Sequence, residues 1–124
     1  MLTNLDAWQV YAKYVEGWKA VSDAARARIA ADVLSENVRY QTPRHDWGTG
    51  RTQVIADMAS FQSKFPGGRF DIGNVSAHHD SALLRWILVQ ADGQVFAQGH
   101  DQITIDADGR IASLLTFAPS VPKP

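Results

Sequence analysis

The chain has 124 residues, the size of one domain built around a single hydrophobic core. Its 12 lysine and arginine residues nearly balance 13 aspartate and glutamate residues, so the formal net charge of -1 argues against nucleic acids and anionic membranes as partners. The absence of cysteine excludes disulfides, thiolate metal sites and cysteine nucleophiles.

The amino-terminal residues do not have the pattern of a targeting or membrane-spanning segment. No basic stretch precedes an apolar run, and no apolar stretch approaches the roughly 20 residues needed to cross a bilayer. We therefore expect a cytoplasmic protein with no membrane partner. We also expect one domain over residues 1–118 and a loose, proline-rich tail over residues 119–124.

Residues 4–18 predict a helix with an unusually wide apolar surface. Thr3 or Asn4 can cap it, and Asp6 stands in the capping-box position after Thr3. At helical spacing the apolar residues form two adjoining stripes, one of Leu5, Trp8, Ala12 and Val15 and one of Tyr11, Tyr14 and Trp18. The aromatic stripe carries polar atoms at its ends, so it suits a pocket wall as well as a core.

The following segment predicts a second helix, a short strand and a loop. Ser22 can cap an alanine-rich helix that continues to about residue 34 and packs antiparallel to the first. Residues 37–42 predict a strand, which the next residue, a proline, ends because it cannot continue a hydrogen-bonded ladder. Residues 44–50 predict a loop. Either this loop is a lid that carries Trp47, or Trp47 packs down on the body of the domain.

Residues 51–65 predict a third, amphipathic helix, which a proline and two glycines end. Beyond this point the hydrophobic pattern changes from a helical period to alternation. Four strands are predicted, with glycine-containing hairpin turns after the second and the third, at residues 69–77, 81–90, 94–105 and 110–118. The second half of the chain therefore predicts an antiparallel sheet.

The predicted strand around Trp86 is apolar on both faces. Leu84, Trp86 and Leu88 share one face, and Leu83, Ile87 and Val89 share the other with Arg85. Helices can cover only one face of a sheet in a domain of this size. We therefore expect a homodimer formed through the outer face of the sheet.

Asp101 interrupts the alternation of its strand. Strand parity places it on one face with Val95, Ala97, Gly99, Ile103 and Ile105. A carboxylate among such neighbours must be paired, solvated or protonated, because an isolated buried charge is too costly to keep. From the residues alone, Asp101 is either a structural aspartate that binds a helix end or an arginine, or the acid–base group of a pocket.

The order of these elements resembles the nuclear transport factor two-like superfamily over nearly the whole chain. Lys13-Tyr14-Val15, Tyr40-Gln41-Thr42-Pro43 and Gly99-His100-Asp101 are similar to SnoaL-like and ketosteroid-isomerase-like members, and residues 65–70, His78-His79-Asp80 and Trp86 are similar to SnoaL-like proteins. The resemblance implies an α+β, cystatin-like fold. In that fold a cone-shaped, strongly curved antiparallel sheet and three helices from the amino-terminal half close an apolar pocket.

The resemblance also implies roles for particular residues. Tyr14 matches the phenolic hydrogen-bond donor of ketosteroid isomerase, and Asp101 matches its neighbouring carboxylic acid, which is kept protonated. Thr42 stands where that isomerase has its aspartate base, so steroid isomerisation is not expected. The expected pocket lining is Trp18, Tyr40, Thr42, Trp47, Met58, Phe61, Leu84, Trp86, Leu114 and Thr116.

His78 and His79 are the candidate replacements for the missing base, because histidine titrates near neutral pH. Adjacent strand residues point to opposite faces, so only one of them could enter the pocket. The alternative is a turn histidine bonded to the backbone. Two histidines beside Asp80 do not make a metal site, and we expect neither a metal nor another cofactor.

These observations predict a SnoaL-like enzyme in which Asp101 acts as acid and base and Tyr14 donates a hydrogen bond. The expected ligand is a hydrophobic, carbonyl-bearing small molecule, and isomerase, cyclase or lyase chemistry would suit these groups. The alternative is a domain of the same fold that only binds a hydrophobic small molecule or dimerises. Thr42 in place of a base favours the alternative, and the carboxyl group on an apolar face favours the enzyme.

Overall fold

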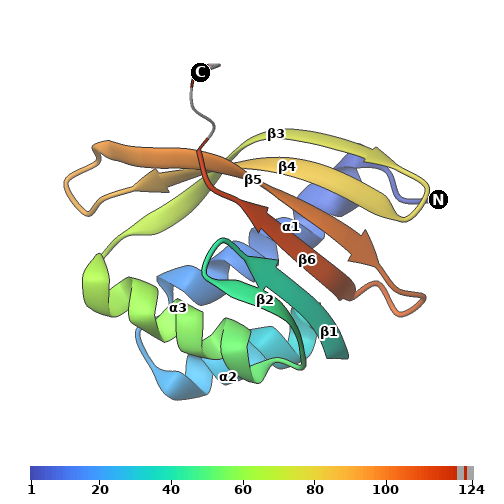
Figure 1. Cartoon of the computed structure of the whole chain (residues 1–124), viewed down its shortest axis with the longest axis horizontal. Helices are drawn as coiled ribbons and strands as arrows, with labels where there is room; N and C mark the ends of the chain where they lie inside the picture. The colour runs from blue at the N-terminus through green and yellow to red at the C-terminus, as the bar shows by residue number, and fades with distance from the viewer. Residues whose placement is uncertain (120–121, 123–124) are drawn as a thin grey trace.

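Three helices and six strands make up the computed structural model of this protein, which describes residues 1–119 and 122 (Figure 1). The helices are α1 (Asn4–Lys19), α2 (Asp23–Val33) and α3 (Thr52–Lys64). The strands are β1 (Leu34–Thr42), β2 (His45–Thr49), β3 (Arg69–His78), β4 (Ser81–Val89), β5 (Val95–Ile105) and β6 (Ile111–Phe117). The predicted tail over residues 119–124 lies mostly outside the described residues.

The strands form one open sheet in the order β2-β1-β6-β5-β4-β3. The four strands of the second half pair as an antiparallel meander, as predicted. β1 joins the free edge of β6 in parallel, so the complete sheet is mixed. This pairing brings the first strand of the chain next to the last and completes one curved surface.

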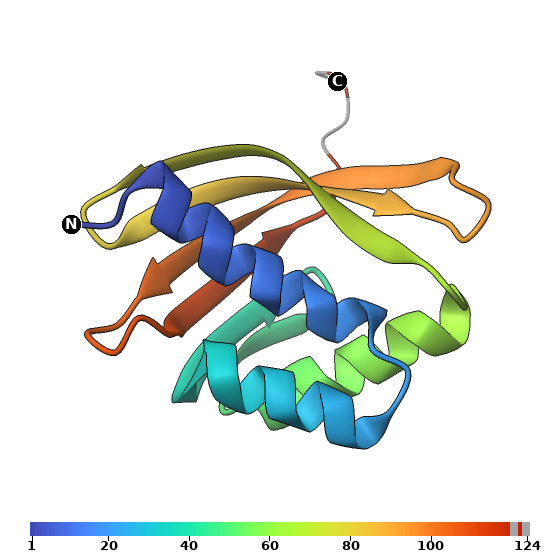
Figure 2. The ribbon, with the colours of Figure 1, turned by 180° about the vertical axis from the view of Figure 1, so that it is seen from behind.

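The helices cover the inner face of that surface. Figure 2 shows α1 lying along the sheet, with α2 and α3 below it and the long strands bending over them. The pairing of β3 with β4 shifts between Ile72 and Val75, an irregularity of the kind that increases strand twist and curvature. Because the sheet bends away from α3, the helices and the strands diverge at one end of the molecule.

The helix starts follow the predicted capping signals. The Thr3 side chain accepts a hydrogen bond from the Asp6 backbone, and the Asp6 carboxylate accepts one from the Thr3 backbone, which completes the capping box. Ser22 caps α2 through the Ala25 backbone N–H. These bonds fix where α1 and α2 begin.

The aromatic stripe of α1 faces the interior, whereas the amino-terminal residues of the other stripe do not. The buried residues of α1 are Ala7, Tyr11, Tyr14 and Gly17. Leu5 and Trp8 of the other stripe remain 62% and 46% exposed. The reason is that α1 packs on the sheet with one narrow face, and its tyrosines occupy that face. Gly17 allows the Met58 side chain of α3 to lie directly against the helix backbone.

Residues 45–49 were predicted as loop and instead form β2, an edge strand paired antiparallel with β1. Loop signals such as Gly48 misled the prediction, because an edge strand needs hydrogen bonds on only one side and tolerates glycine. The turn at Pro43 and Arg44 reverses the chain between the two strands. As a result, His45 is held on the sheet rather than in a mobile connection.

The outer face of the sheet is only partly apolar. Leu83 is 47% exposed and Ile87 is half-buried, whereas Val89 is buried and does not contribute as predicted. The register shift between Leu88 and Val89 breaks the strict alternation on which that prediction rested. Arg85 lies on the outer side and bonds to the side chains of Asn74 and Gln98, away from the helices.

No helix of the described residues is long and apolar enough to cross a membrane.

Candidate functional site

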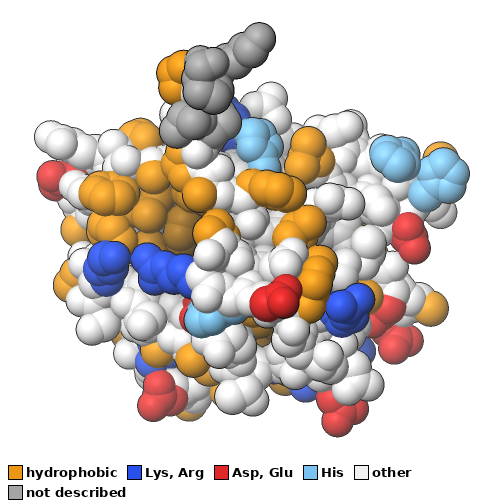
Figure 3. All heavy atoms as spheres, viewed as in Figure 1, with side chains coloured by type: hydrophobic (Ala, Val, Ile, Leu, Met, Phe, Trp, Pro, Cys, Tyr) orange, Lys and Arg blue, Asp and Glu red, His pale blue; other side chains and the backbone are white. Residues whose placement is uncertain are grey.

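A cavity of about 570 Å³ opens where α3 and the curved sheet diverge. Side chains from α1, α3 and the inner face of the sheet line it, and it is open to solvent at one side, where Figure 3 shows an apolar hollow edged by basic groups. Of the residues predicted for this pocket, eight do line it, namely Tyr14, Trp18, Tyr40, Thr42, Phe61, Trp86, Asp101 and Thr116.

Aromatic rings build the apolar part of the cavity wall. Trp18 contacts Phe61 and Phe70 edge to face, with ring centroids 5.9 and 5.5 Å apart. Phe70 in turn contacts Trp86 at 5.4 Å. Gly99 lies under the Trp86 indole, where a Cβ atom would collide with the ring, so glycine lets this tryptophan lie flat on β5. Such interlocked rings make a rigid surface suited to an apolar ligand.

Asp101 belongs to the closed end of this wall. It stands on β5 between Leu84 of β4 and Thr116 of β6 and is only 4% exposed. The Tyr11 hydroxyl donates a hydrogen bond of 2.6 Å to its Oδ2. Burial raises the pKa of Asp101 from 3.8 to about 6, and the hydrogen-bonding neighbours Tyr11 and Thr116 oppose part of that rise.

Two buried polar atoms of this wall lack hydrogen-bond partners within the described part of the chain. They are Oδ1 of Asp101 and the indole Nε1 of Trp86. The Thr116 hydroxyl is close enough to lower the pKa of Asp101 but makes no hydrogen bond of standard geometry to Oδ1. Buried polar atoms are nearly always paired in folded proteins, and both of these atoms belong to residues that line the cavity.

Tyr11 is a site residue that the sequence reasoning missed. We expected Tyr14 to contact Asp101, but it is Tyr11, one turn earlier on α1, that holds the carboxyl group. The Tyr14 ring lies 5.5 Å from the Tyr11 ring, and burial followed by the nearby Asp101 charge raises the pKa of its hydroxyl well above 10.0. The i, i+3 spacing of the two tyrosines was the available signal, because both must face the same side of the helix.

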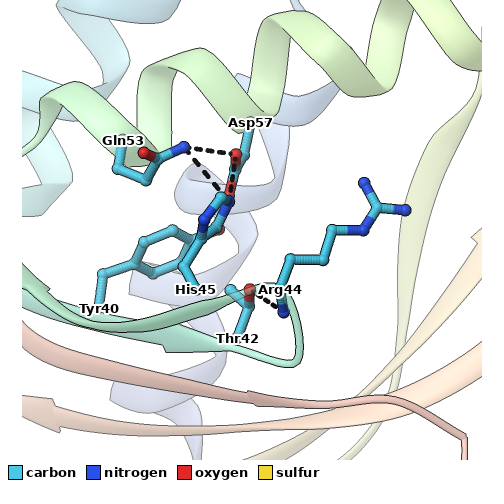
Figure 4. A network of polar contacts seen from close by, with 6 residues as sticks. All are labelled: Tyr40, Thr42, Arg44, His45, Gln53 and Asp57. Carbon is cyan, nitrogen blue, oxygen red and sulfur yellow. Dashed lines mark hydrogen bonds and ion pairs between the residues drawn. The ribbon is translucent and has the colours of Figure 1, made fainter.

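A second polar cluster lies nearer the open side and joins β1, β2 and α3 (Figure 4). Its centre is Asp57, whose Oδ2 accepts a bond of 2.7 Å from the Tyr40 hydroxyl. Its Oδ1 lies 3.2 Å from Nε2 of His45 and accepts a 2.9 Å bond from the Gln53 amide. All four residues line the cavity, so a histidine oriented by a carboxylate reaches the ligand space.

Tyr14 and Tyr40 lie between the two aspartates. The pKa of Tyr40 is raised mainly by burial, and Tyr14, Asp57 and Asp101 raise it further. Tyr14 likewise experiences the charges of both Asp101 and Asp57. Both phenols therefore stay protonated over the whole physiological range and act as hydrogen-bond donors.

Thr42, which the resemblance matches to the base of the isomerase, has a hydroxyl with a structural task. Oγ1 accepts a 3.1 Å hydrogen bond from the Arg44 backbone N–H, which fixes the turn between β1 and β2. The turn sets the position of His45 at the start of β2. The histidine that reaches the cavity is therefore His45, which sequence reasoning placed in a loop.

His78 and His79, the predicted replacements for the base, lie outside the cavity. They form the exposed turn between β3 and β4, next to the amino terminus and at the opposite end of the molecule from the carboxyl end of α3 (Figure 1). His79 has a positive φ of 53°, and the two rings contact each other through their Nδ1 atoms at 3.1 Å. The prediction failed because strand parity gives the direction of a side chain and not its position along the sheet.

Four other residues predicted for the pocket also lie elsewhere. Met58, Leu84 and Leu114 are fully buried in the hydrophobic core behind the cavity wall, because the same inward faces supply both core and cavity. Trp47 is 40% exposed and packs under the Arg39 guanidinium, which is 4.7 Å from the ring centroid. Within the described residues, no group of three or more His, Cys, Asp or Glu side chains is arranged to hold a metal ion.

A sequence profile of the SnoaL-like domain matches residues 12–114, which is most of the chain and includes Tyr14, His45, Asp57 and Asp101. The chain belongs to the SnoaL-like domain family. No protein of curated function matches it.

Several solved structures share its fold. A proposed isomerase of the SnoaL-like family from Agrobacterium tumefaciens is 26% identical, with a TM-score of 0.83 over 94% of this chain and 99% of that one. A proposed SnoaL-like polyketide cyclase from Jannaschia is 19% identical, with a TM-score of 0.72 over 92% and 85%. A proposed ketosteroid isomerase from Kribbella flavida is 22% identical, with a TM-score of 0.65 over 98% and 83%.

Proposed function

We propose that this SnoaL-like domain is an enzyme of the isomerase, cyclase or lyase type that moves protons on a hydrophobic, carbonyl-bearing small molecule. The observation that carries the proposal is the Asp101 carboxyl group, which lies in the apolar wall with one oxygen bonded to Tyr11 and the other unpaired. A purely structural aspartate would have its oxygens satisfied by the protein. This carboxyl group instead faces a cavity of a size suited to a small organic ligand.

The proposed reaction divides proton transfer between two groups. Protonated Asp101, with Tyr14 beside it, donates a hydrogen bond and then a proton to the carbonyl oxygen as negative charge develops there. His45 accepts the proton from the carbon next to the carbonyl group, so an enol forms with the atoms balanced. In the tautomer that this reaction requires, Nε2 of His45 donates its hydrogen to Asp57, 3.2 Å away, and Nδ1 is the unprotonated ring nitrogen. In an isomerisation His45 returns its proton to another carbon while Asp101 takes back the enol hydroxyl proton. In an elimination Asp101 takes back the same proton as the carbonyl group re-forms, and the proton on His45 goes to the departing group.

The test is exchange of carbon-bound protons in a ketone probe. Tetralone, a bicyclic aryl ketone, is incubated in deuterated water with the protein, and NMR follows loss of the signal from the protons next to the carbonyl group. We expect acceleration over buffer and a loss of about a hundredfold or more in Asp101→Asn. Asp108→Asn, which changes an exposed aspartate in the β5–β6 turn, is the matched control. Equal rates for the parent and Asp101→Asn would contradict the proposal.

The second candidate function is binding without catalysis, and Thr42 favours it. A hydroxyl used to hold a turn cannot act as a base near neutral pH, so the position of the isomerase base is lost. If His45 does not replace it, the cavity only binds its ligand. Tight binding of tetralone with no exchange above the buffer rate would support this candidate.

We also propose that the domain forms a homodimer through the outer face of its sheet. Exposed apolar side chains on the outer face include Leu83 and Phe117, and half-buried Ile87 lies on the same side. An apolar surface on a strand face is stabilised when a second copy covers it. The proposal is tested by sedimentation, as described in the Discussion.

A further inference from the structure

We propose that the cavity selects a hydrophobic organic anion, whose acidic group binds between Arg44 and Lys64 at the rim. The apolar body of the ligand lies against the aromatic wall, and its carbonyl end lies toward Asp101. This inference deepens the proposed function, because it names the ligand class of the same cavity. It requires binding to that cavity and does not require catalysis.

The rim carries two basic side chains from two different elements. Arg44 belongs to the turn between β1 and β2, and Lys64 is in the last turn of α3; both line the cavity and both are exposed. Within the described residues neither side chain makes an ion pair or a side-chain hydrogen bond. Figure 4 shows the Arg44 guanidinium extending away from Asp57. Two positive charges at the opening are therefore free to bind an anion.

The acidic residues of the cavity do not neutralise these charges by direct contact. Asp57 is the nearer to the opening, and its oxygens are already engaged by Tyr40, His45 and Gln53. Asp101 lies at the closed end and is bound to Tyr11. The distribution of charge is thus polarised, with basic groups at the rim and a carboxyl group at the far wall.

This polarity sets the orientation of the ligand. A carboxylate or sulfonate at the closed end would be desolvated beside Asp101 with no lysine or arginine of the described residues to pair with, which is costly whether Asp101 is neutral or charged. At the rim the same group meets an arginine, whose planar guanidinium binds carboxylate and sulfonate oxygens in pairs, and a lysine. An amphipathic anion is therefore bound with its apolar part inward, which brings an internal carbonyl group toward Asp101 and Tyr14.

The competing explanation is that Arg44 and Lys64 only keep the surface soluble. Two fluorescent probes distinguish the two explanations, because they share an aromatic skeleton and differ in one charged group. Anilinonaphthalene sulfonate is the anion, and N-phenyl-naphthylamine is its uncharged counterpart. Both gain fluorescence in apolar cavities, so their affinities for the whole protein can be measured by titration.

We expect the sulfonate to bind the parent protein more tightly than the neutral probe, with an affinity that falls as salt is added. Arg44→Gln combined with Lys64→Gln should weaken sulfonate binding about tenfold, since each exposed ion pair contributes roughly twofold to fivefold. Binding of the neutral probe should change by less than about twofold, because the aromatic wall is untouched. Lys13→Gln combined with Arg28→Gln removes the same charge from exposed positions outside this cavity and should change neither affinity.

Three results would overturn the proposal: failure of the sulfonate to bind, equal weakening of both probes, or equal effects of the rim and control variants. The outcome is separable from that of the proposed function. Asp101→Asn should keep the preference for the sulfonate while losing proton exchange. A rim variant that keeps the preference disproves the ligand class alone, whereas an Asp101→Asn variant that keeps exchange disproves the catalytic role alone.

Discussion

Two aspartates line the same cavity, and they differ in what surrounds them. Asp101 is almost fully buried, accepts one hydrogen bond from Tyr11 and has one oxygen unpaired. The Asp57 side chain is 21% exposed and is surrounded by Tyr40, His45 and Gln53. Identical side chains therefore stand in an apolar setting at the closed end and in a polar one nearer the opening.

The difference assigns them different tasks. Burial raises the pKa of Asp101 to about 6, so near neutral pH this carboxyl group exchanges between a carboxylate and a protonated form that can donate its proton. Asp57 accepts hydrogen bonds from neighbouring side chains, and it therefore orients His45 and Tyr40. When two groups of one cavity lie in different environments, one can donate a proton and the other can assist its acceptance near neutral pH.

Replacement of each aspartate by asparagine should separate the two roles in the tetralone exchange assay. Asp101→Asn removes the proton donor and should lower the rate by about a hundredfold or more. Asp57→Asn leaves His45 in place but misorients it, and should lower the rate by roughly tenfold. Equal losses in the two variants would show that the aspartates act as one unit and would contradict the division proposed here.

The same pair should change stability in opposite directions at pH 7. The folded state holds the Asp101 proton up to a pH of about 6, whereas the unfolded state releases it near 3.8. The stabilisation from this proton is therefore full below pH 3.8 and is lost as the pH rises to about 6, at a cost of about 3 kcal/mol. Asp101→Asn avoids this cost and should be more stable than the parent at pH 7 and nearly equal to it near pH 4.

The Asp57→Asn variant should instead be less stable than the parent by about 2 kcal/mol. The NH2 group of the asparagine would face hydrogen-bond donors, from which a carboxylate oxygen can accept and an NH2 group cannot. Urea unfolding of both variants and the parent at several pH values measures these differences. A stability loss in Asp101→Asn at pH 7 would mean that its charged form is the one stabilised in the fold.

His45 links the two regions, and its role can be tested by chemical rescue. His45→Ala should lower exchange by about tenfold or more, and added imidazole should restore part of the rate. The neutral naphthylamine probe should bind the variant as it binds the parent, because His45 is not part of the aromatic wall. A variant whose rate is low and unaffected by imidazole would indicate that His45 only supports the structure.

The outer face of the sheet is independent of both aspartates. Ile87→Glu places a charge at the centre of the proposed dimer surface and should shift the equilibrium toward monomer without changing probe affinity. Analytical ultracentrifugation at micromolar concentration measures the change. The control is Arg85→Gln, which lies on the same face of the sheet and leaves a polar side chain at that position. A parent protein that sediments as a monomer would disprove the dimer.

The smallest effect is expected at Trp47. Because this tryptophan packs under Arg39 outside the cavity, Trp47→Phe should leave the ligand-induced change in tryptophan fluorescence intact. Trp18 and Trp86 line the cavity and should carry that signal. Loss of the signal in Trp47→Phe would place the ligand on the other side of β2.

The fold and one end of the site were predictable because they depend on local pattern. Thr3, Ser22 and the change of hydrophobic period marked the elements, and Asp101 stood out as the one acidic residue on an apolar face. Its partner Tyr11 was not predicted, since the sequence identified the tyrosine face of α1 but not which turn lies over β5.

The second cluster could not be predicted for a different reason. His45, Asp57 and Tyr40 come from three separate elements, and their contacts depend on how β2 pairs with β1 and how α3 crosses them. Reading residues 44–50 as a loop hid the placement of His45. His78 and His79 were favoured instead because adjacent histidines are conspicuous in a sequence, although the turn they form lies far from the cavity.

The central claim is that the cavity wall raises the pKa of Asp101 toward neutrality, so that it can both donate and accept a proton, and carboxyl-carbon NMR titration tests this claim most directly. The Asp101 resonance is assigned by its absence from Asp101→Asn and followed from pH 3 to pH 8. We expect an apparent pKa of about 6, and a higher value in Tyr11→Phe, because the Tyr11 hydrogen bond lowers it. A pKa at or below 3.8 would contradict the account, since Asp101 would then be a structural carboxylate with no proton to donate.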